Sequence, residues 1–207
     1  MGLEKFFDGM FCINLEERTD RWEQAQKEFD KLNIKDKVLH FPALKFDNGA
    51  LGCRESHLSI IKKAKDEGLK NVLIFEDDVL VIDENITHLN KSLDQLTDQD
   101  WDLFYLGATV DPNVGRLVTH TPNLVKTNFA YTTHAYAINH TMYDFILKEA
   151  PFHPIIDVFY CRYIVPRQKT FIMNPMLCIQ QEGYSNIENQ HADYGWMIEF
   201  FNKCLIK

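Results

Sequence analysis

The stretch Asn71-Val-Leu-Ile-Phe-Glu-Asp-Asp-Val-Leu-Val-Ile82 carries two hydrophobic runs that are joined by three consecutive carboxylates. The runs at 71–75 and 79–82 are typical of buried strands, so the acidic residues stand where a strand ends. Carboxylates removed from water are costly unless a cation lies among them or they take up protons. Hard oxygen ligands favour Mg²⁺ or Mn²⁺ over zinc or copper. The stretch therefore predicts a strand that ends in a site for a divalent ion.

Strands and helices alternate around this stretch through the first half of the chain. Short hydrophobic runs predict strands at 10–14, 38–41, 72–75 and 101–106. Apolar residues at helical spacing predict helices over 22–32 and 55–65, with Gly49 and Gly52 in a turn before the second helix. Gly68 is placed to end that helix. The alternation indicates an α/β fold with a mainly parallel central sheet and flanking helices.

The C-terminal half of the sequence is less regular. Glycines and prolines between 107 and 128 predict a long loop or an antiparallel excursion. A β-rich run at 130–138 and a short helix at 141–150 follow, and the pattern over 152–175 is mixed. Neither an internal repeat nor a linker interrupts the sequence, so we expect a single domain over residues 1–207.

The composition argues against several classes of protein. A formal net charge of −8 and a pI near 5.4 do not suit a nucleic-acid-binding surface. No apolar run approaches the ~20 residues needed to cross a bilayer, which leaves only peripheral contact with a membrane. The five scattered cysteines suit neither a disulfide framework nor a structural zinc motif, which favours a reducing compartment. The N-terminus has no signal pattern, so we expect a cytoplasmic protein.

Two segments that are distant in sequence are expected to meet at one edge of the sheet. The segment Asn14–Arg21 follows the first predicted strand, and Glu76-Asp77-Asp78 follows a later one. In open α/β sheets, ligands bind in the crevice outside the carboxyl ends of the strands. We therefore expect these two segments to share one crevice.

The sequence resembles glycosyltransferase family 25, the lipopolysaccharide and procollagen galactosyltransferase family. The segments that carry the resemblance run in order along the chain and are Asn14-Leu-Glu-Glu-Arg-Thr-Asp-Arg21, Gly52-Cys-Arg-Glu-Ser-His-Leu58, Ile74-Phe-Glu-Asp-Asp-Val79, Thr133-His-Ala-Tyr-Ala-Ile138, Pro154-Ile-Ile-Asp157 and Gln180 to Ile187. Thr133 stands where the family commonly has glycine, and Asn186 where it usually has aspartate. The resemblance implies a GT-A fold, a UDP-sugar donor that is usually UDP-galactose, a divalent metal, and inversion at the anomeric carbon.

Such a transferase needs positive charge beside its departing diphosphate. A divalent cation held by the acidic triplet can supply this charge. Because side chains alternate along extended backbone, Glu76 and Asp78 should point to one side and Asp77 to the other. We assign Asp78 to the metal. Glu76 is assigned to the donor ribose or to the surroundings of the metal, and Asp77 is a candidate catalytic residue that faces the sugar or a structural partner. The alternative is a solvated acidic turn.

The donor is expected to lie between the triplet and the first strand. Arg18 and Arg21, close to Asn14, present guanidinium groups that can grip phosphate oxygens. The alternative for these arginines is an exposed start of a helix, paired with Glu17, Asp20 or Glu23. Ser56 and His57 either shape the donor site or serve in packing, Ser56 as a helix cap and His57 by hydrogen bonding between helix and sheet.

Inversion requires a base that takes the proton of the acceptor hydroxyl. Asp157 lies among apolar residues that should raise its pKa, and it is the candidate base; a helix cap before Val158 is the alternative. His191 is a candidate third metal ligand beside Asp78 and Glu76. The aromatic residues Tyr131, Tyr136 and Trp196 either stack on a ligand or pack in the core.

The leading hypothesis is a metal-dependent inverting glycosyltransferase that moves a hexose, galactose first, from a UDP-sugar to a glycan or glycosylated acceptor. The cofactor would be Mn²⁺ or Mg²⁺. One alternative is a Mg²⁺-dependent phosphoryl-transfer or receiver-like protein, because clustered acids at strand ends serve those proteins too. Another is a catalytically inactive sugar-binding module.

Overall fold

The strand that ends in the acidic triplet lies inside a large mixed sheet. The computed structural model describes residues 2–185, 190–192 and 194–206. Its strands are β1 (Gly9–Asn14), β2 (Leu39–Pro42), β3 (Asn71–Glu76), β4 (Val79–Val81), β5 (Leu103–Tyr105), β6 (Leu117–Thr121), β7 (Leu124–Thr127), β8 (Ala135–Asn139), β9 (Thr170–Met173), β10 (Cys178–Gln180), β11 (Gly183–Ser185), β12 (Gln190–Ala192) and β13 (Leu205–Ile206). Its α-helices are α1 (Leu3–Phe6), α2 (Thr19–Lys31), α3 (Gly49–Asp66), α4 (Ile86–Thr97), α5 (Tyr143–Glu149), α6 (Ile156–Tyr163) and α7 (Trp196–Cys204).

Nine of the described strands form one sheet in the order β13-β6-β7-β9-β5-β8-β3-β1-β2. The pairs β1–β2, β1–β3, β5–β9 and β6–β13 are parallel, whereas β8 and β7 are antiparallel to both of their neighbours. Seven of these nine strands therefore point the same way, and the predicted mainly parallel sheet is confirmed. β4 pairs with β10 outside this sheet, and β11 pairs with β12.

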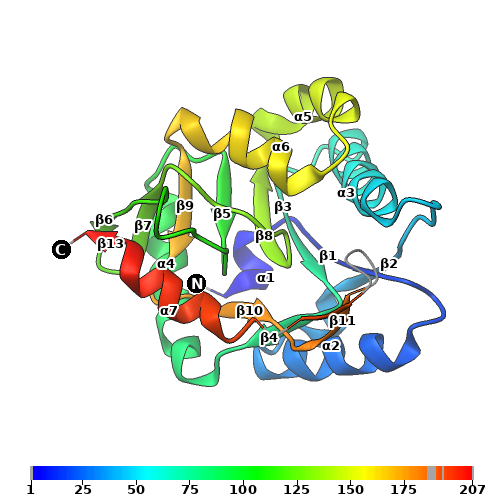
Figure 1. Ribbon diagram of the computed structural model, residues 1–207, viewed down its shortest axis with the longest axis horizontal. Coiled ribbons are helices and arrows are strands. Elements are labelled where there is room, and N and C mark those ends of the chain that lie inside the picture. Colours follow the sequence, from blue (N-terminus) through cyan, green and yellow to red (C-terminus); the bar gives the residue numbers. More distant parts are fainter. Residues whose placement is uncertain (1, 186–189, 193, 207) are drawn as a thin grey trace.

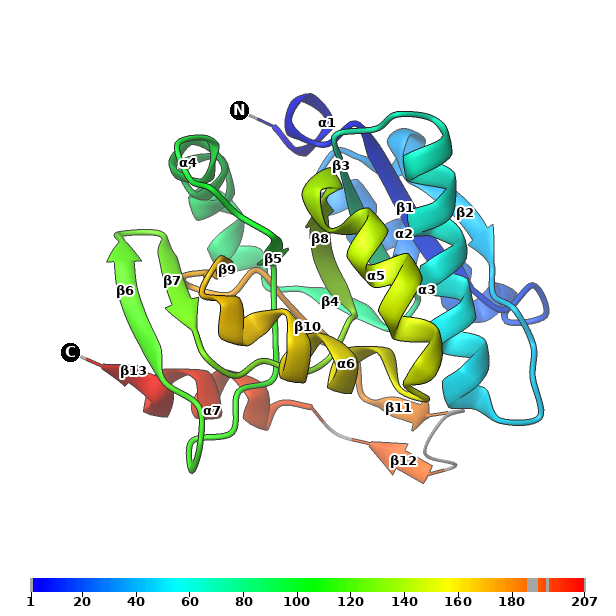
Figure 2. The ribbon, with the colours of Figure 1, turned by 90° about the horizontal axis from the view of Figure 1, so that it is seen from above.

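Helices cover both faces of the sheet, as Figures 1 and 2 show. One core cluster joins buried residues of α3, α5 and α6 to side chains of β1, β3 and β8. A second cluster joins α1, α2 and α4 to the alternate residues of the same strands. The period of two along β3 decides the split: Val72 and Ile74 belong to the first cluster, and Leu73 and Phe75 to the second. Burial on both faces explains why β3 is an unbroken hydrophobic run.

The start of α3 differs from the sequence-based expectation. The helix begins at Gly49, so Gly49 and Gly52 lie in its first turns and not in a turn that precedes it. The side chain of Asn48 caps the helix by accepting hydrogen bonds from the backbone N–H groups of residues 50 and 51. A Cβ atom at Gly52 would stand 2.4 Å from the carbonyl oxygen of Leu44. Close approach of the preceding loop therefore requires this glycine, which local propensity alone assigns to a turn.

The end of α3 is as predicted. Gly68 has a φ of +69°, a backbone conformation that glycine adopts readily. Its N–H donates to the carbonyl of Lys65, and the N–H of Leu69 donates to the carbonyl of Ala64. This pair of bonds is the Schellman arrangement, and it turns the chain directly into β3.

Other elements emerge only from the structure. The segment between residues 107 and 128 contains the antiparallel hairpin β6–β7, which was one of its two expected forms. The mixed segment 152–175 contains α6 and β9, and α4 and α7 were not predicted. Among the described residues, no helix has both the length and the apolar character to cross a membrane.

Candidate functional site

The acidic turn, defined as Glu76, Asp77 and Asp78, lies at the carboxyl edge of the sheet beside the end of β1. In the parallel register, Ile13 of β1 is opposite Glu76 of β3, so Asn14 and the acidic turn leave the sheet side by side. This register brings together the two segments that were expected to meet. The three carboxylates then diverge, and each has partners on a different element.

Asp77 is bound by the segment after β1. Asn14 donates from Nδ2 to one Asp77 oxygen over 2.7 Å, and Arg21 Nη1 lies 3.0 Å from the other oxygen. Burial raises the pKa of Asp77, although the bonds from Asn14 and Arg21 act in the opposite direction. His40 Nε2 lies 3.0 Å from the amide oxygen of Asn14. Asp77 therefore fixes the β1–α2 connection to the acidic turn, which corresponds to the structural partner that was one of its two expectations.

Glu76 faces the opposite side of the sheet, toward α3. Thr133 donates its hydroxyl to Glu76 Oε1 over 2.5 Å, and His57 Nε2 lies 3.3 Å from the same oxygen. Burial on its own would raise the pKa of Glu76, but the His57 and Thr133 contacts lower it on balance. Glu76 is therefore a carboxylate held in its charged form by neighbours that contact one oxygen.

His57 is part of a buried polar chain. Its side chain is fully buried, and its Nδ1 lies 2.9 Å from the hydroxyl of Tyr136. That hydroxyl lies 3.2 Å from the hydroxyl of Tyr160. Tyr136 is thus a core residue, as one of its two interpretations held, and its hydroxyl orients the imidazole ring toward Glu76.

Asp78 turns toward β10. Gln180 Nε2 donates to Asp78 Oδ2 over 3.2 Å, and the backbone N–H of Gln181 donates to the Asp78 carbonyl over 2.6 Å. The other carboxylate oxygen, Oδ1, is buried and has no hydrogen-bond partner among the described residues. Burial, followed by repulsion from Glu76 and Asp77, raises the pKa of Asp78 to about 7. A carboxylate with one bare buried oxygen among other acids fits a hard divalent cation.

Arg18 and Ser56 have local partners in the structure. The Arg18 guanidinium lies 2.8 Å from Asp20 in a partly exposed pair, which was one of the pairings considered for this arginine. Ser56 is buried inside α3, donates to the Gly52 carbonyl over 2.7 Å and accepts from the Leu44 N–H over 2.8 Å. Asn48, not Ser56, caps the helix. Ser56 therefore secures the loop in front of α3, next to His57 in the chain.

Asp157 lies in the first turn of α6. Its carboxylate accepts from the backbone N–H of Val158 over 2.6 Å and from that of Thr132 over 3.3 Å. Burial raises the pKa of Asp157, as its apolar neighbours predict, although these two hydrogen bonds act against the rise. The N-cap position belongs to Ile155, so Asp157 is not the cap itself.

The third expected metal ligand cannot be placed in the same way. His191 lies in β12, opposite Tyr184 of β11, but its side chain lies outside the described residues, as does Asn186. No role was predicted for Gln180, although its side chain donates a hydrogen bond to Asp78. Only the resemblance to the family pointed to its segment.

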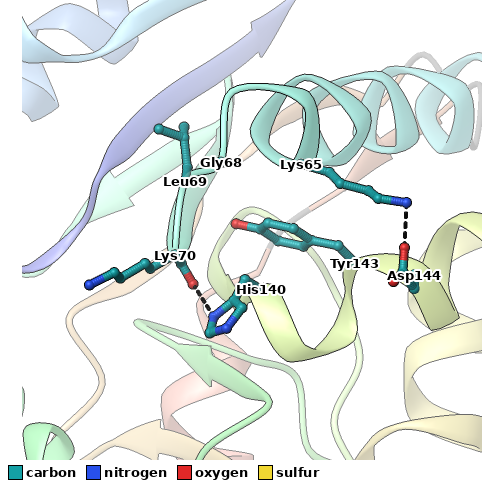
Figure 3. A pocket seen from close by; sticks show the side chains of 7 residues that line it. All are labelled: Lys65, Gly68, Leu69, Lys70, His140, Tyr143 and Asp144. Atoms are coloured by element: carbon teal, nitrogen blue, oxygen red, sulfur yellow. Dashed lines mark hydrogen bonds and ion pairs between the residues drawn. The ribbon is translucent and has the colours of Figure 1, made fainter.

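A surface pocket lies at the other end of β3. Figure 3 shows it between the end of α3 and the start of α5. The pocket has a volume of about 240 Å³. Lys65 pairs there with Asp144, and His140 Nδ1 lies 3.0 Å from the carbonyl of Lys70, the residue before β3. The acidic turn begins with Glu76, the last residue of that strand, so this pocket is separate from the candidate site.

Comparison with known proteins places the chain in a family. Residues 42–150 match the family model described as "Glycosyltransferase family 25 (LPS biosynthesis protein)". The chain is 34% identical over 113 residues to a probable inactive glycosyltransferase 25 family member 3 from Rattus norvegicus, covering 53% of this chain and 20% of that protein. It is 24% identical over 184 residues to procollagen galactosyltransferase 2 from Homo sapiens, covering 73% of this chain and 29% of that protein.

The structural comparison agrees on the fold. The structure is similar to that of a glycosyltransferase involved in the glycosylation of the major capsid of PBCV-1, with a TM-score of 0.56 at 13% identity. That match covers 87% of this chain and 95% of the other. The fold is of the GT-A type that the sequence resemblance implied. The chain spans less than a third of the length of the two curated relatives given above. The match to the family model begins just before α3 and covers more than half of the residues of this chain. The chain therefore belongs to glycosyltransferase family 25.

Proposed function

We propose that the protein is an inverting glycosyltransferase that uses Mn²⁺ or Mg²⁺ and moves a hexose, galactose first, from a UDP-sugar to a glycan or glycosylated acceptor. The observation that carries the proposal is the Asp78 carboxylate at the carboxyl edge of the sheet. Its Oδ1 is buried without a partner among the described residues, next to two further carboxylates. When bound there, a divalent cation would supply positive charge to the departing diphosphate.

The surrounding residues support a donor at the same edge. Glu76 has one oxygen engaged by Thr133 and His57, which leaves the other for a ribose hydroxyl. Arg21 already lies beside Asp77, and Arg18 lies one helical turn earlier in a surface pair with Asp20. A partly exposed pair of that kind contributes little stability, so Arg18 can exchange Asp20 for a phosphate oxygen at small cost. Asn14 holds Asp77, His57 contacts Glu76, and Ser56 secures the loop in front of α3.

Asp157 is the proposed base. Burial raises its pKa, which makes the carboxylate a better proton acceptor, and two backbone N–H groups hold it in one orientation. Asp77 is proposed to act through its contacts with Asn14 and Arg21, which set the position of the sugar. His191 is proposed as a further ligand of the ion, approaching from β12.

The cysteines bear on the compartment in which the reaction takes place. All five are free thiols and four of them are buried, which supports a reducing compartment, the cytoplasm. We propose that the acceptor is a glycan or glycosylated molecule, met in solution or at a membrane surface.

A second candidate function is an inactive module that binds a nucleotide sugar without turnover. The specific reason is that relatives from Rattus norvegicus and Mus musculus are named as inactive members of the family. Such a module would keep the contacts among Asn14, Arg21 and Asp77 and would lack turnover.

Thermal denaturation with UDP and Mn²⁺ tests the proposal. Because ligands that bind the native state stabilise it, UDP with Mn²⁺ should raise Tm more than either alone. Asp78→Asn, which keeps the shape of the side chain, should remove the joint effect, whereas Asp144→Asn at the opposite edge should retain it. Hydrolysis of UDP-galactose by the wild type but not by Asp78→Asn would favour the transferase over the module. No joint rise in Tm at millimolar ligand would refute the metal-dependent donor site.

A further inference from the structure

The motif Gly52-Cys-Arg-Glu-Ser-His57 places a thiol and an imidazole on one face of α3, and the donor site does not account for the thiol. Cys53 and His57 are four residues apart in the helix, so their side chains lie one above the other. Both face the end of β3. Ligand atoms of Cys53, His57 and Glu76 all lie within 4.8 Å of one another.

We propose that Cys53, His57 and Glu76 form a binding site for a borderline divalent cation, Zn²⁺ first, that is separate from the Asp78 site for a hard cation. A thiolate, an imidazole and one carboxylate are zinc ligands, whereas Mg²⁺ and Mn²⁺ prefer oxygen alone. The proposal does not depend on the proposed transferase function.

The spacing of the ligand atoms suits a zinc ion. His57 Nε2 and Glu76 Oε1 are 3.3 Å apart. Two tetrahedral ligands, each about 2.0–2.1 Å from zinc, stand roughly 3.3 Å from each other. His57 Nε2 is fully buried, points at Glu76 and lacks a hydrogen-bond partner of good geometry among the described residues. A cation between the two atoms would satisfy both.

The groups around these ligands also match a metal site. Histidine ligands of zinc usually make a hydrogen bond through the second ring nitrogen, and His57 Nδ1 has Tyr136 at 2.9 Å. The Tyr136 hydroxyl can accept that bond and donate to Tyr160, which leaves the lone pair of Nε2 for the metal. The carboxylate is oriented as well, because Thr133 donates to Glu76 Oε1.

An ion can reach this site and can complete its coordination there. Cys53 is half-buried, and the Glu76 side chain is 19% exposed, so the three ligands are not sealed from solvent. Three protein ligands leave a fourth position for water. On binding, a metal–sulfur bond replaces the S–H bond of Cys53, and the thiol proton passes to solvent.

Cobalt substitution tests the proposal directly. Protein stripped with a chelator is titrated with Co²⁺, and one equivalent should produce a thiolate-to-cobalt charge-transfer band with the intense visible bands of four-coordinate cobalt. One equivalent of Zn²⁺ should abolish these bands, whereas Mg²⁺ should not. Cys53→Ser should remove the charge-transfer band, and His57→Gln should weaken zinc binding at least tenfold.

Matched variants distinguish this site from cobalt binding at another thiol or at Asp78. Cys161→Ser, which removes the buried thiol of α6, should keep the cobalt spectrum. Asp78→Asn should keep it too, so loss of the proposed donor site does not affect the result. An unchanged spectrum in Cys53→Ser overturns the proposal, as does its loss in Cys161→Ser.

A measurement on the wild type covers the case in which Cys53→Ser fails to fold. Zn²⁺ should protect Cys53 from alkylation by iodoacetamide, as read by mass spectrometry of its peptide. The rate at Cys161 should be unchanged. Equal alkylation of Cys53 with and without Zn²⁺ also overturns the proposal.

Discussion

Individual carboxylates in this protein differ because their neighbours differ. Glu76 is charged because His57 and Thr133 offset its burial, whereas Asp78 has a pKa of about 7 because burial and two adjacent acids dominate. Burial raises the pKa of Asp77 as well, and the contacts with Asn14 and Arg21 act against that rise. Three consecutive acidic residues thus differ in how their surroundings shift the pKa, and the sequence order alone does not show which residue has which surroundings.

The base assignment predicts a specific kinetic defect at Asp157. Asp157→Asn removes the proton acceptor but keeps the shape of the side chain and one oxygen, which can still accept from one of the two N–H groups, since Val158 donates to Oδ1 and Thr132 to Oδ2. Transfer should fall about 10²–10⁴-fold, the usual contribution of general base catalysis. The Kd for UDP should stay within about threefold, as measured by calorimetry. Equal losses in transfer and donor affinity would argue against a base and for a structural role.

The buried His134 predicts how stability depends on pH. Burial lowers the pKa of His134 to about 4 from its ordinary value of 6.5. Between these values the unfolded chain binds a proton that the folded protein does not, so the free energy of unfolding falls as the pH is lowered from about 6.5 to 4. The contribution is about 3 kcal/mol and is fully present above pH 6.5.

His134→Gln should remove this contribution. Urea denaturation at pH 7.5 and pH 5 should show a smaller loss of stability in the variant than in the wild type, because other titrating groups are common to both proteins. Parallel pH dependences in the two proteins would exclude His134 as the source.

At the scale of elements, the sequence predicted β1, β3, the body of α3 and the end of α3, because each follows from a local pattern. The chain-distant partners were not predictable in this way: Gln180 meets Asp78 across 102 residues, and Tyr136 meets His57 across 79. The predicted start of α3 was wrong. Gly52 is required by its close contact with Leu44, and local helix propensity does not reflect such a contact. The helix α4 does carry a local signal, since Leu89, Leu93 and Leu96 recur at helical spacing.

Likewise, some contacts of the candidate site were predictable from the sequence and others were not. Sheet-edge reasoning brought Asn14 and the acidic turn together, because parallel strands end at one edge. It did not reveal that Arg21 pairs with Asp77, since that depends on how α2 leaves the sheet.

The end of α3 gives a prediction about a single element. Gly68 has a φ of +69° and open space around its Cβ position, so backbone strain is the only cost of a side chain there. Gly68→Ala should reduce the free energy of unfolding by about 1–2 kcal/mol. Gly68→Asn should cost less, because asparagine tolerates this conformation. Urea denaturation measures both, and equal costs for the two variants would contradict the role of backbone strain.

At the scale of the whole molecule, one sheet connects the two core clusters. Side chains of β1, β3 and β8 alternate between the clusters, so neither cluster keeps its strands if the other is lost. The prediction of a single domain over residues 1–207 implies that both clusters unfold together.

Cooperative unfolding checks this expectation. Trp22 lies in α2, Trp101 precedes β5 and Trp196 begins α7, so their fluorescence reports on separate regions. Variants that keep one tryptophan each, with the others changed to phenylalanine, should share one urea midpoint with far-ultraviolet circular dichroism. Separate midpoints for Trp22 and Trp196 would indicate two independently folding units.

The division between the main sheet and the β4–β10 pair has a mechanical consequence for the acidic turn. The backbone of Glu76 is bonded to His134 next to β8, whereas Asp78 is bonded to Gln180 and Gln181 at the end of β10. The backbone of Glu76 is thus held by the main sheet and Asp78 by the end of β10, with Asp77 between them. A displacement of β10 would therefore move Asp78 relative to Glu76. The distance between the two carboxylates thus depends on a strand from the C-terminal part of the chain.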